Sequence, residues 1–398
     1  MTKQLQDAYI VAATRTPIGK APRGMFKNTR PDDLLVRVLQ SVMAQVPDLD
    51  PKLVEDAIIG CSFPEGAQGL NMARNGILLA GLPNTIGGVT VNRYCASGIT
   101  AIAMAADRIR VGQADVMIAG GAESMSMVPM MGFHPSVNMN VFKDENIGMA
   151  YGMGLTAENV AKQWKVSRES QDAFALLSHQ KAIAAQLAGE FDDETTSVDI
   201  IERFPNLATG QIDISTRTVN RDEGARAEST LAALAKLKPV FSPKGSVTAG
   251  NSSQTSDGAG ALILVSEKIL KQFNLTPLAR FASFAVRGVP PEIMGIGPKE
   301  AIPAALRAAG ITQDQLDWIE LNEAFAAQAL AVIQDLGLDP SKVNPMGGAI
   351  ALGHPLGATG AIRAATTIHA LRRKNLKYGM VTMCVGTGMG AAGIFERM

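Results

Sequence analysis

The sequence predicts an α/β protein made of two similar halves, and three observations support this prediction. Short apolar segments alternate with segments of helical spacing, which is typical of a mostly parallel sheet with helices on both faces. The order of these segments in the first half recurs in the second. The chain has 398 residues, 46% of them hydrophobic and 19% charged, so it can bury more than one core and form at least two domains.

The elements of the first half follow from the spacing of its apolar residues. We expect strands at residues 8–13, 56–61, 88–92, 115–120 and 259–265. One helix is expected to start at residues 29–33, where acidic residues occupy the first turn. Two further helices are expected at residues 71–81 and 96–111. The strands are short and mostly apolar, which indicates burial on both faces of a sheet.

An insertion interrupts this first sheet at about residues 126–246. Its front part is rich in methionine, and such a segment is either an adaptable core or a pocket for variable apolar chains. Helices are expected at residues 156–164, 167–187 and 231–237. Residues 192–221 are polar and are interpreted as irregular.

The second half repeats the first, with a strand expected at residues 279–286 and a helix at 298–309. The corresponding pairs of segments are 316–321 with 54–61, 324–336 with 71–81, and 379–383 with 115–120. Two such units packed together would bring loops from the ends of both sheets to one cleft. We therefore expect a first half at 1–125 plus 247–272, an inserted domain at 126–246, and a second half at 273–398.

Composition excludes several classes of protein. The formal net charge is zero and the pI is about 6.9, so the chain lacks the long-range positive field that nucleic acids or anionic membranes attract. No apolar run reaches the length of a transmembrane helix, and residues 1–7 contain no basic leader. A cytoplasmic protein without integral membrane contact is expected.

The chain has three cysteines, Cys61, Cys95 and Cys384, which is too few for a disulfide framework, and their spacing does not suit a metal site. Each is therefore either an inert core residue or a nucleophile. Cys95 follows a strand and precedes a helix start, where backbone N–H groups and the helix dipole would stabilise a thiolate. Cys384 ends another strand, before glycines that could cradle an anion.

A nearby base would activate such a thiol, and the sequence offers four histidines. His179 and His369 lie within helical patterns and are interpreted as surface or packing residues, and His134 lies in the insertion. His354 stands in a glycine-flanked loop and is the preferred candidate.

Five motifs together resemble the thiolase family. They are residues 91–98 (VNRYCASG), 248–253 (TAGNSS), 322–326 (NEAFA), 353–355 (GHP) and 384–388 (CVGTG). They occur in the order of that family, and the resemblance runs from residue 8 to residue 398. It implies the duplicated thiolase fold, in which two mixed-sheet α/β halves pack as an αβαβα sandwich with an inserted loop domain that binds coenzyme A.

The resemblance implies acyl transfer between coenzyme A and a 3-ketoacyl chain. Cys95 would form an acyl-cysteine intermediate, and Cys384 would exchange a proton with the C2 carbon of acetyl-CoA. His354 would activate the thiol and donate to the thioester oxygen, assisted by a water held on Asn322. The N–H groups of Cys95 and Gly386 would form a second oxyanion hole. Coenzyme A would be a substrate, with no permanently bound cofactor and no metal.

Because the chain is neutral, local cations must meet the phosphates of coenzyme A. The resemblance places Arg226 near the nucleotide and Ser253 on the pantetheine arm, and it adds Ala249, Phe325 and Met153 as contacts. Arg226 can alternatively be a solvated charge at a helix edge.

Two departures from the biosynthetic acetoacetyl-CoA thiolases favour the degradative branch. Those enzymes have a longer cationic loop where this chain has the short segment 131–135, and they have a histidine where Gly152 stands. The chain thus resembles the 3-ketoacyl-CoA thiolases of fatty acid β-oxidation, which implies a homodimer able to dock hydratase/dehydrogenase subunits.

Three alternatives to this function stand beside it. The nearest is an acetyl-CoA acetyltransferase. A decarboxylating ketoacyl synthase would need a second histidine in place of Cys384. A non-catalytic acyl-CoA-binding homologue should have lost part of the Cys, His, Cys set, and all three residues are present.

Overall fold

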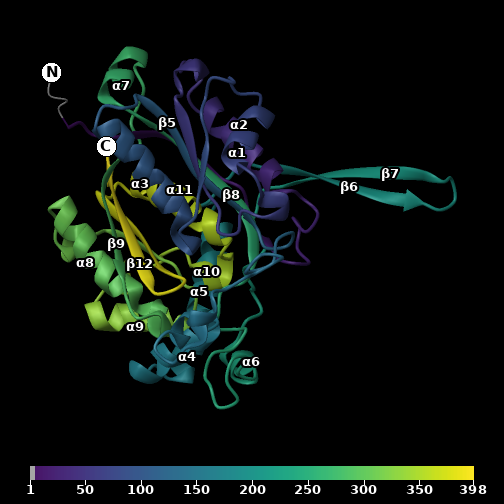
Figure 1. Ribbon diagram of the computed structural model, residues 1–398, viewed down its shortest axis with the longest axis vertical. Coiled ribbons are helices and arrows are strands. Elements are labelled where there is room, and N and C mark those ends of the chain that lie inside the picture. The colour runs from purple at the N-terminus through teal and green to yellow at the C-terminus, as the bar shows by residue number, and fades with distance from the viewer. Residues whose placement is uncertain (1–4) are drawn as a thin grey trace.

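The strands of both halves belong to one mixed sheet, shown in the computed structural model of Figure 1. The structure describes residues 5–398, so residues 1–4, part of the segment expected to lack a leader, lie outside the described residues. The first half supplies β1 (Tyr9–Arg15), β3 (Asp56–Gly60), β4 (Val89–Val91), β5 (Val116–Ser124) and β8 (Ser256–Val265). The second supplies β9 (Ala279–Gly288), β10 (Trp318–Leu321), β11 (Tyr378–Val385) and β12 (Met389–Arg397).

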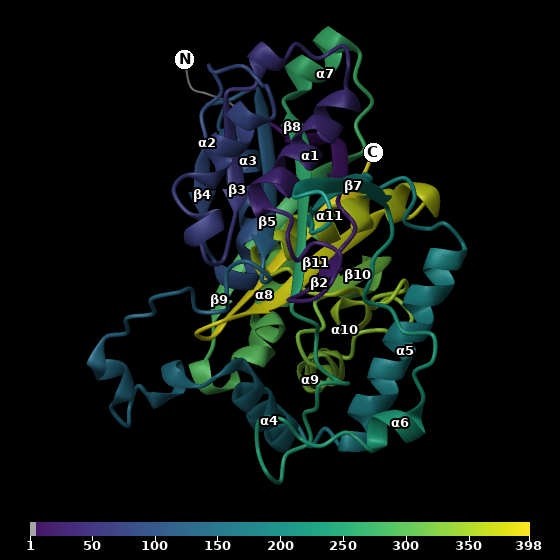
Figure 2. The ribbon, with the colours of Figure 1, turned by 90° about the vertical axis from the view of Figure 1, so that its right-hand side faces the viewer.

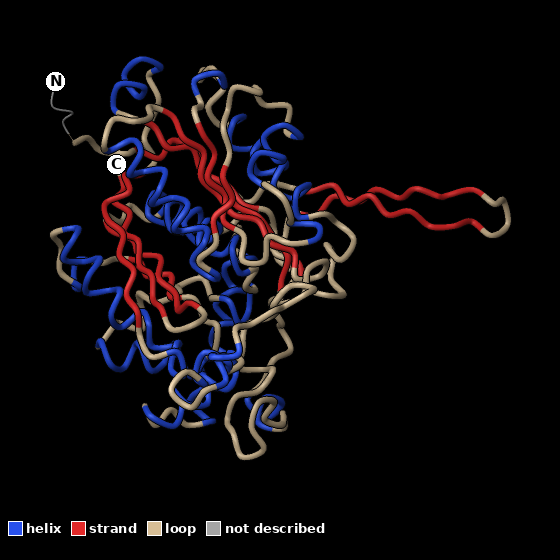
Figure 3. Tube along the Cα trace, in the orientation of Figure 1, coloured by secondary structure: helices blue, strands red, loops and turns tan. Residues whose placement is uncertain are grey.

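The strand order is β10-β11-β12-β9-β1-β8-β5-β3-β4, with the short β2 (Gly19–Lys20) paired to β8. The halves are joined where β1 meets β9, and that contact consists of two residue pairs, Tyr9 with Arg280 and Ile10 with Ala279. The strands of each half therefore form separate groups, which Figure 3 shows as two sets of red tubes within the body of the protein.

The expectation of a mostly parallel sheet is wrong. β3 pairs in parallel with β4 and β5, and β10 with β11, whereas β8 and β12 each run antiparallel to both neighbours. All ten residues of β8 are buried, so its apolar sequence has no polar alternation that would reveal an antiparallel strand. β12 was not predicted as a strand.

Helices form the other layers of the expected αβαβα sandwich, which the fold confirms (Figure 1). α3 (Ser97–Arg110) and α11 (Leu356–Arg373) pack between the two groups of strands in one core. α1 (Pro31–Ala44) and α2 (Met72–Leu79) cover the outer face of the first half. α8 (Gly297–Ala309) and α9 (Ala326–Leu336) cover that of the second.

The insertion contains α4 (Met153–Gln163), α5 (Arg168–Leu187) and α6 (Leu231–Ala235). Figure 2 shows them on one side of the molecule, with α9 and the short α10 (Ala349–Leu352) beside them. α7 (Glu267–Phe273), which was not predicted, follows β8. No helix within residues 5–398 is long and apolar enough to cross a membrane.

The interpretation of residues 192–221 as irregular is also wrong. They include a long hairpin of β6 (Val198–Asn206) and β7 (Gln211–Val219), which projects from the body in Figure 1. Most of the hairpin is exposed on both faces, so its sequence carries polar residues throughout and lacks the half-buried alternation by which strands are recognised.

α3 and α11 approach so closely that glycine is required between them. A Cβ atom added at Gly360 would lie 2.2 Å from the backbone nitrogen of Ile99, and one added at Gly98 would lie 2.7 Å from that of Ala361. Neither neighbour is the end of a flexible side chain. The helices would have to move apart to admit even a methyl group.

We expect Gly360→Ala to lower the free energy of unfolding by about 1–3 kcal/mol, because overpacking forces the backbone to shift. Gly288→Ala is the matched control, since the nearest atom to its added Cβ lies at 3.9 Å, and it should change stability by less than about 0.5 kcal/mol. Denaturant unfolding of both variants measures the difference. Equal stabilities would contradict the steric role of Gly360.

Candidate active site

Cys95 lies in the turn that joins β4 to α3. The turn is a short 3-10 segment, Tyr94–Ala96, in which Tyr94 has φ of 44°. The Ser97 hydroxyl fastens it, because its oxygen accepts from the Arg93 N–H at 2.8 Å and its hydrogen is donated to the Tyr94 carbonyl at 2.7 Å. The half-buried thiol is thereby fixed at the start of α3.

The electrostatics of Cys95 differ from the sequence expectation. Burial raises the pKa of its thiol to about 12, while hydrogen bonds from the N–H groups of Cys95 and Gly386 act in the opposite direction. The expected N–H donors are thus present, but loss of hydration outweighs them. Cys95 is a neutral thiol at rest, and its activation requires proton removal.

Cys384 lies at the end of β11 and is fully buried. It belongs to an apolar cluster with Phe325 and Met294, against which Met153 packs. Burial, followed by the nearby charge of a Cys95 thiolate, raises the pKa of Cys384. The two sulfurs therefore share one region of the protein.

His354 precedes α11 and is held on both sides of its ring. Its Nδ1 lies 2.6 Å from the Thr359 hydroxyl oxygen, and its Nε2 lies 3.3 Å from Nδ2 of Asn322. Only 4% of His354 is exposed. Burial, and then the charge of Arg363, lowers its pKa to about 3, so the imidazole is neutral.

A chain of contacts joins these groups. The Asn322 N–H donates to the carbonyl of Thr382 at 2.9 Å, two residues before Cys384. Gly386, two residues beyond Cys384, donates to the sulfur of Cys95. β11 therefore connects the His354–Asn322 pair of one side with the Cys95 turn of the other.

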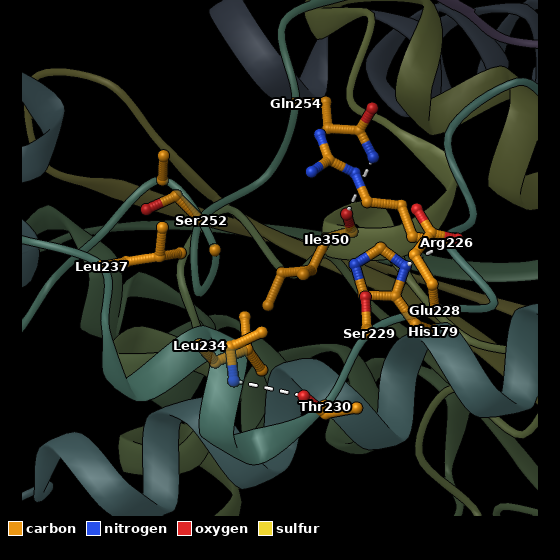
Figure 4. Close-up of a pocket in the computed structure, with 13 residues that line it drawn as sticks. His179, Arg226, Glu228, Ser229, Thr230, Leu234, Leu237, Ser252, Gln254 and Ile350 are labelled. Carbon is orange, nitrogen blue, oxygen red and sulfur yellow. Dashed lines mark hydrogen bonds between the residues drawn. The ribbon is translucent and has the colours of Figure 1, made fainter.

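The residues expected to bind coenzyme A fall into two groups. Arg226 and Ala249 line a cavity of about 270 Å³ beside α6, whose wall also includes Ser252 and Gln254 (Figure 4). Ser253 lies between these two wall residues and donates its N–H to Ala324 at 2.9 Å. The second group, Phe325 and Met153, lies in the apolar cluster around Cys384. Ser252 forms a β-bridge with Phe325, which connects the cavity to that cluster.

The structure also identifies site residues that the sequence did not. His179, interpreted as a surface or packing histidine, is buried in the cavity wall and accepts from the Arg226 N–H at 3.2 Å through Nδ1. The Glu123 carboxylate accepts from the N–H groups of Ser62 and Gly357 at 2.7 and 2.8 Å. Thr359, whose hydroxyl contacts His354, is the third such residue. Helical spacing could not reveal any of them, because their partners are distant in sequence or lie across a turn.

The remaining cysteine and histidines take no part in this arrangement. Cys61 is fully buried, as expected for a core residue, with its thiol 3.7 Å from the Glu123 carboxylate. His369 bonds the Ala13 carbonyl at 2.9 Å, and His134 is exposed in the insertion.

Acid should destabilise the protein through His179. Burial, and then the charge of Arg226, lowers its pKa to about 4, below the ordinary value of 6.5. The unfolded chain therefore takes up a proton as pH falls through 6.5, whereas the folded chain does not. The contribution of neutral His179 to the free energy of unfolding is therefore fully present above pH 6.5 and is lost as the pH falls from 6.5 to 4.

His179→Gln removes this effect. Burial raises the pKa of Glu320 to about 7, so Glu320 changes the stability with pH in the opposite direction. Glu320 is present in both proteins, and its contribution cancels when wild type and His179→Gln are compared. We expect the stability difference between wild type and His179→Gln to fall by about 1 kcal/mol from pH 6 to pH 5. Denaturant unfolding at both pH values measures it. A difference independent of pH would contradict the neutral His179.

The chain is similar to known proteins over nearly its whole length. Family models of the thiolase N-terminal and C-terminal domains match residues 8–268 and 275–397. The chain is 49% identical to a 3-ketoacyl-CoA thiolase of Bacillus subtilis, over 98% of this chain and 100% of that protein. It is 47% identical to the peroxisomal 3-ketoacyl-CoA thiolase B of Mus musculus, over 98% and 91% of the two chains.

Solved structures agree with these relatives. The acetyl-CoA acetyltransferase of Bacillus anthracis superposes with a TM-score of 0.89 at 38% identity, covering 100% of both chains. Human mitochondrial 3-ketoacyl-CoA thiolase in complex with CoA superposes with a TM-score of 0.87 at 38% identity, covering 99% and 98%. Family models over nearly the whole chain and relatives of almost equal length therefore show that the chain belongs to the thiolase family.

Proposed function

We propose that the protein is a 3-ketoacyl-CoA thiolase, which uses coenzyme A to cleave 3-ketoacyl-CoA into acetyl-CoA and a shortened acyl-CoA in fatty acid β-oxidation. The observation that carries this proposal is the convergence of two thiols and a neutral imidazole at one junction. The names of the relatives support the substrate class.

Cys95 is the nucleophile. His354 is neutral and can accept the thiol proton on Nε2, after which the sulfur attacks the 3-keto carbon. The N–H groups that point at this sulfur, those of Cys95 and Gly386, are placed to receive the oxygen that becomes negative. One such donor typically contributes about 10²- to 10³-fold to the rate.

Cleavage of the Cα–Cβ bond leaves the acyl group on Cys95 and the electron pair on acetyl-CoA as an enolate. The buried Cys384 thiol gives its proton to C2 of this enolate and becomes a thiolate. The thiol of incoming coenzyme A gives its proton to the Cys384 thiolate and attacks the acyl-Cys95 carbonyl. The Cys95 thiolate that leaves takes back the proton held by His354, and the site is restored. Atoms and charges balance without a redox group.

Asn322 supports the enolate oxygen together with His354. Its amide oxygen is buried and has no hydrogen-bond partner within residues 5–398. A buried amide group of this kind favours an ordered water. Such a water, with the His354 Nε2–H, would donate to the thioester oxygen of the enolate.

The cavity beside α6 holds coenzyme A, and the inserted segment 126–246 acts as its binding domain. Arg226 supplies a local cation for phosphate, which a neutral protein requires. Ala249 and Ser253 flank the pantetheine arm, and the bridge from Ser252 to Phe325 leads toward the thiols. Phe325 and Met153 enclose the end of the arm near Cys384.

A long acyl chain is favoured over acetoacetyl-CoA by the space at Gly152. A Cβ atom added there would have no neighbour within 4 Å. The position that holds an imidazole in biosynthetic thiolases is therefore open here. The alternative, acetyl-CoA acetyltransferase, is supported by the structural likeness to the Bacillus anthracis protein.

A homodimer would form through β4, which is the last strand of the sheet and pairs with β3. Its Val89 is 38% exposed, and Leu78 and Leu79 of the adjacent α2 are also exposed. Open edge strands with apolar side chains favour pairing with another chain, and a mass measurement in solution checks this. Docking of hydratase/dehydrogenase subunits and action in the cytoplasm stay predictions of the sequence.

Cys95→Ala should reduce thiolysis by more than about 10³-fold, because no acyl-enzyme can form. Cys384→Ser should still form acetyl-Cys95 from acetyl-CoA while carbon–carbon exchange falls by a similar factor. Mass spectrometry of the Cys384→Ser protein checks for the added acetyl group. An acetyl group on any residue other than Cys95, or full activity of Cys95→Ala, would overturn the assignment.

The chain-length preference separates the two candidate functions. At fixed coenzyme A, we expect kcat/KM for C8 and longer 3-ketoacyl-CoA to exceed that for the C4 substrate by about tenfold or more, because each buried methylene contributes about 0.8 kcal/mol. Gly152→His should reverse this preference by filling the open space. A wild-type preference for the C4 substrate would instead support the acetyltransferase.

A further inference from the structure

The hydroxyl of Thr359 contacts the ring nitrogen of His354 that faces away from the reacting groups. Thr359 lies in the first turn of α11 and is 1% exposed. Its oxygen is 2.6 Å from His354 Nδ1. Within the described part of the chain, this is the hydrogen bond that the hydroxyl makes.

This contact differs from the one that helical threonines commonly make. They bond the carbonyl four residues earlier, as Thr367 does to the Arg363 carbonyl at 2.8 Å. Thr366 donates to the Glu194 carboxylate at 2.7 Å. The Thr359 hydroxyl is directed at the imidazole instead.

The contact fixes which nitrogen faces the reacting groups. With Nδ1 held against α11, Nε2 lies toward Asn322, whose backbone is bonded to β11 ahead of Cys384. A ring turned over would place carbon atoms at these two contacts and would leave both partners unsatisfied. One bond to each nitrogen therefore determines the orientation of the ring.

A hydroxyl suits a histidine that changes its protonation state. It accepts a hydrogen bond when Nδ1 carries the proton, and by rotation it donates one when Nδ1 is bare. A carboxylate in this place could accept only, and its negative charge would favour the imidazolium. A neutral hydroxyl supports both states and leaves the ring free to release the proton it has received.

We propose that Thr359 is a positioning residue, which holds His354 with Nε2 toward the reacting cysteines and supports both its neutral tautomers and its protonated form. This inference rests on the proposed function for its effect on turnover. The orientation of the ring can be tested independently of that function.

Three variants test the role of the hydroxyl. Thr359→Val keeps the shape of the side chain and removes the hydroxyl, Thr359→Ser keeps the hydroxyl, and Thr367→Val removes a buried hydroxyl that has no contact with His354. We expect Thr359→Val to lower kcat by about 10- to 100-fold, the size of effect found for residues that orient metal-binding histidines. KM for coenzyme A should change less than about twofold, and Thr359→Ser should stay within about threefold of wild type.

Thr367→Val should keep wild-type kcat and pH profile even where its melting temperature falls as far as that of Thr359→Val. Wild-type kcat in folded Thr359→Val, or an equal loss in Thr359→Ser, would overturn the proposal. If Thr359→Val does not fold, Thr359→Ala replaces it. The kcat of Thr359→Ser must then still exceed that of Thr359→Ala.

A direct readout of the ring distinguishes failure of this inference from failure of the proposed function. With four histidines in the chain, the ring nitrogens can be labelled with 15N and the His354 pair assigned by its absence in His354→Asn. The His354 ring shifts should change in Thr359→Val and not in Thr367→Val. Unchanged shifts would refute the positioning role, whereas a wild-type protein without thiolysis would refute only the proposed function.

Discussion

The direct backbone contact between α3 and α11 is the constraint on which the site depends. Cys95 lies immediately before α3 and His354 immediately before α11, so the distance between these helices sets the distance between the two groups. Gly98 and Gly360 allow main chain to touch main chain at this point. Larger residues would separate the helix starts, and with them the two reacting side chains, by an amount that proton transfer would not tolerate.

A buried carboxylate reinforces this contact from the side of the first half. Glu123 is the penultimate residue of β5, and its carboxylate accepts from the backbone of Ser62, after β3, and from that of Gly357, at the start of α11. Gln68 adds a further bond at 2.7 Å. Burial raises the pKa of Glu123 while these bonds lower it. The carboxyl group thereby couples the first turn of α11 to the strands of the other half.

The sequence was sufficient where local pattern determines structure. Elements of the first half, among them α3, could be predicted because their apolar spacing is visible in a short window. Local pattern offered Cys95, His354 and Cys384 only as candidates, and the five motifs that resemble the thiolase family singled them out. The antiparallel course of β8 could not, since a strand buried on both faces reads alike in either direction. The β6–β7 hairpin could not either, because it has no buried face.

Contacts that a local helical pattern does not show explain why other residues of the site could not be predicted. His179 looks like any helical histidine until the chain beyond α5 returns to place Arg226 against it. Thr359 looks like a helical threonine until its hydroxyl is seen to turn toward His354. The position of Cys95 at a helix start correctly indicated N–H donors, but it could not indicate how much hydration the half-buried sulfur loses in the fold, which reversed the direction of the pKa shift.

The raised pKa of Cys95 affects how the site can react. Both thiols have raised pKa values and His354 has a lowered one, so none of the three is charged at rest. A neutral resting state is the one that burial favours, because an isolated charge in such surroundings is costly. Charge then appears only when substrate is present to receive it, at the sulfur that the N–H groups of Cys95 and Gly386 already face. The same burial that makes each thiol a poor nucleophile alone therefore makes proton transfer among the three groups the step that controls reactivity.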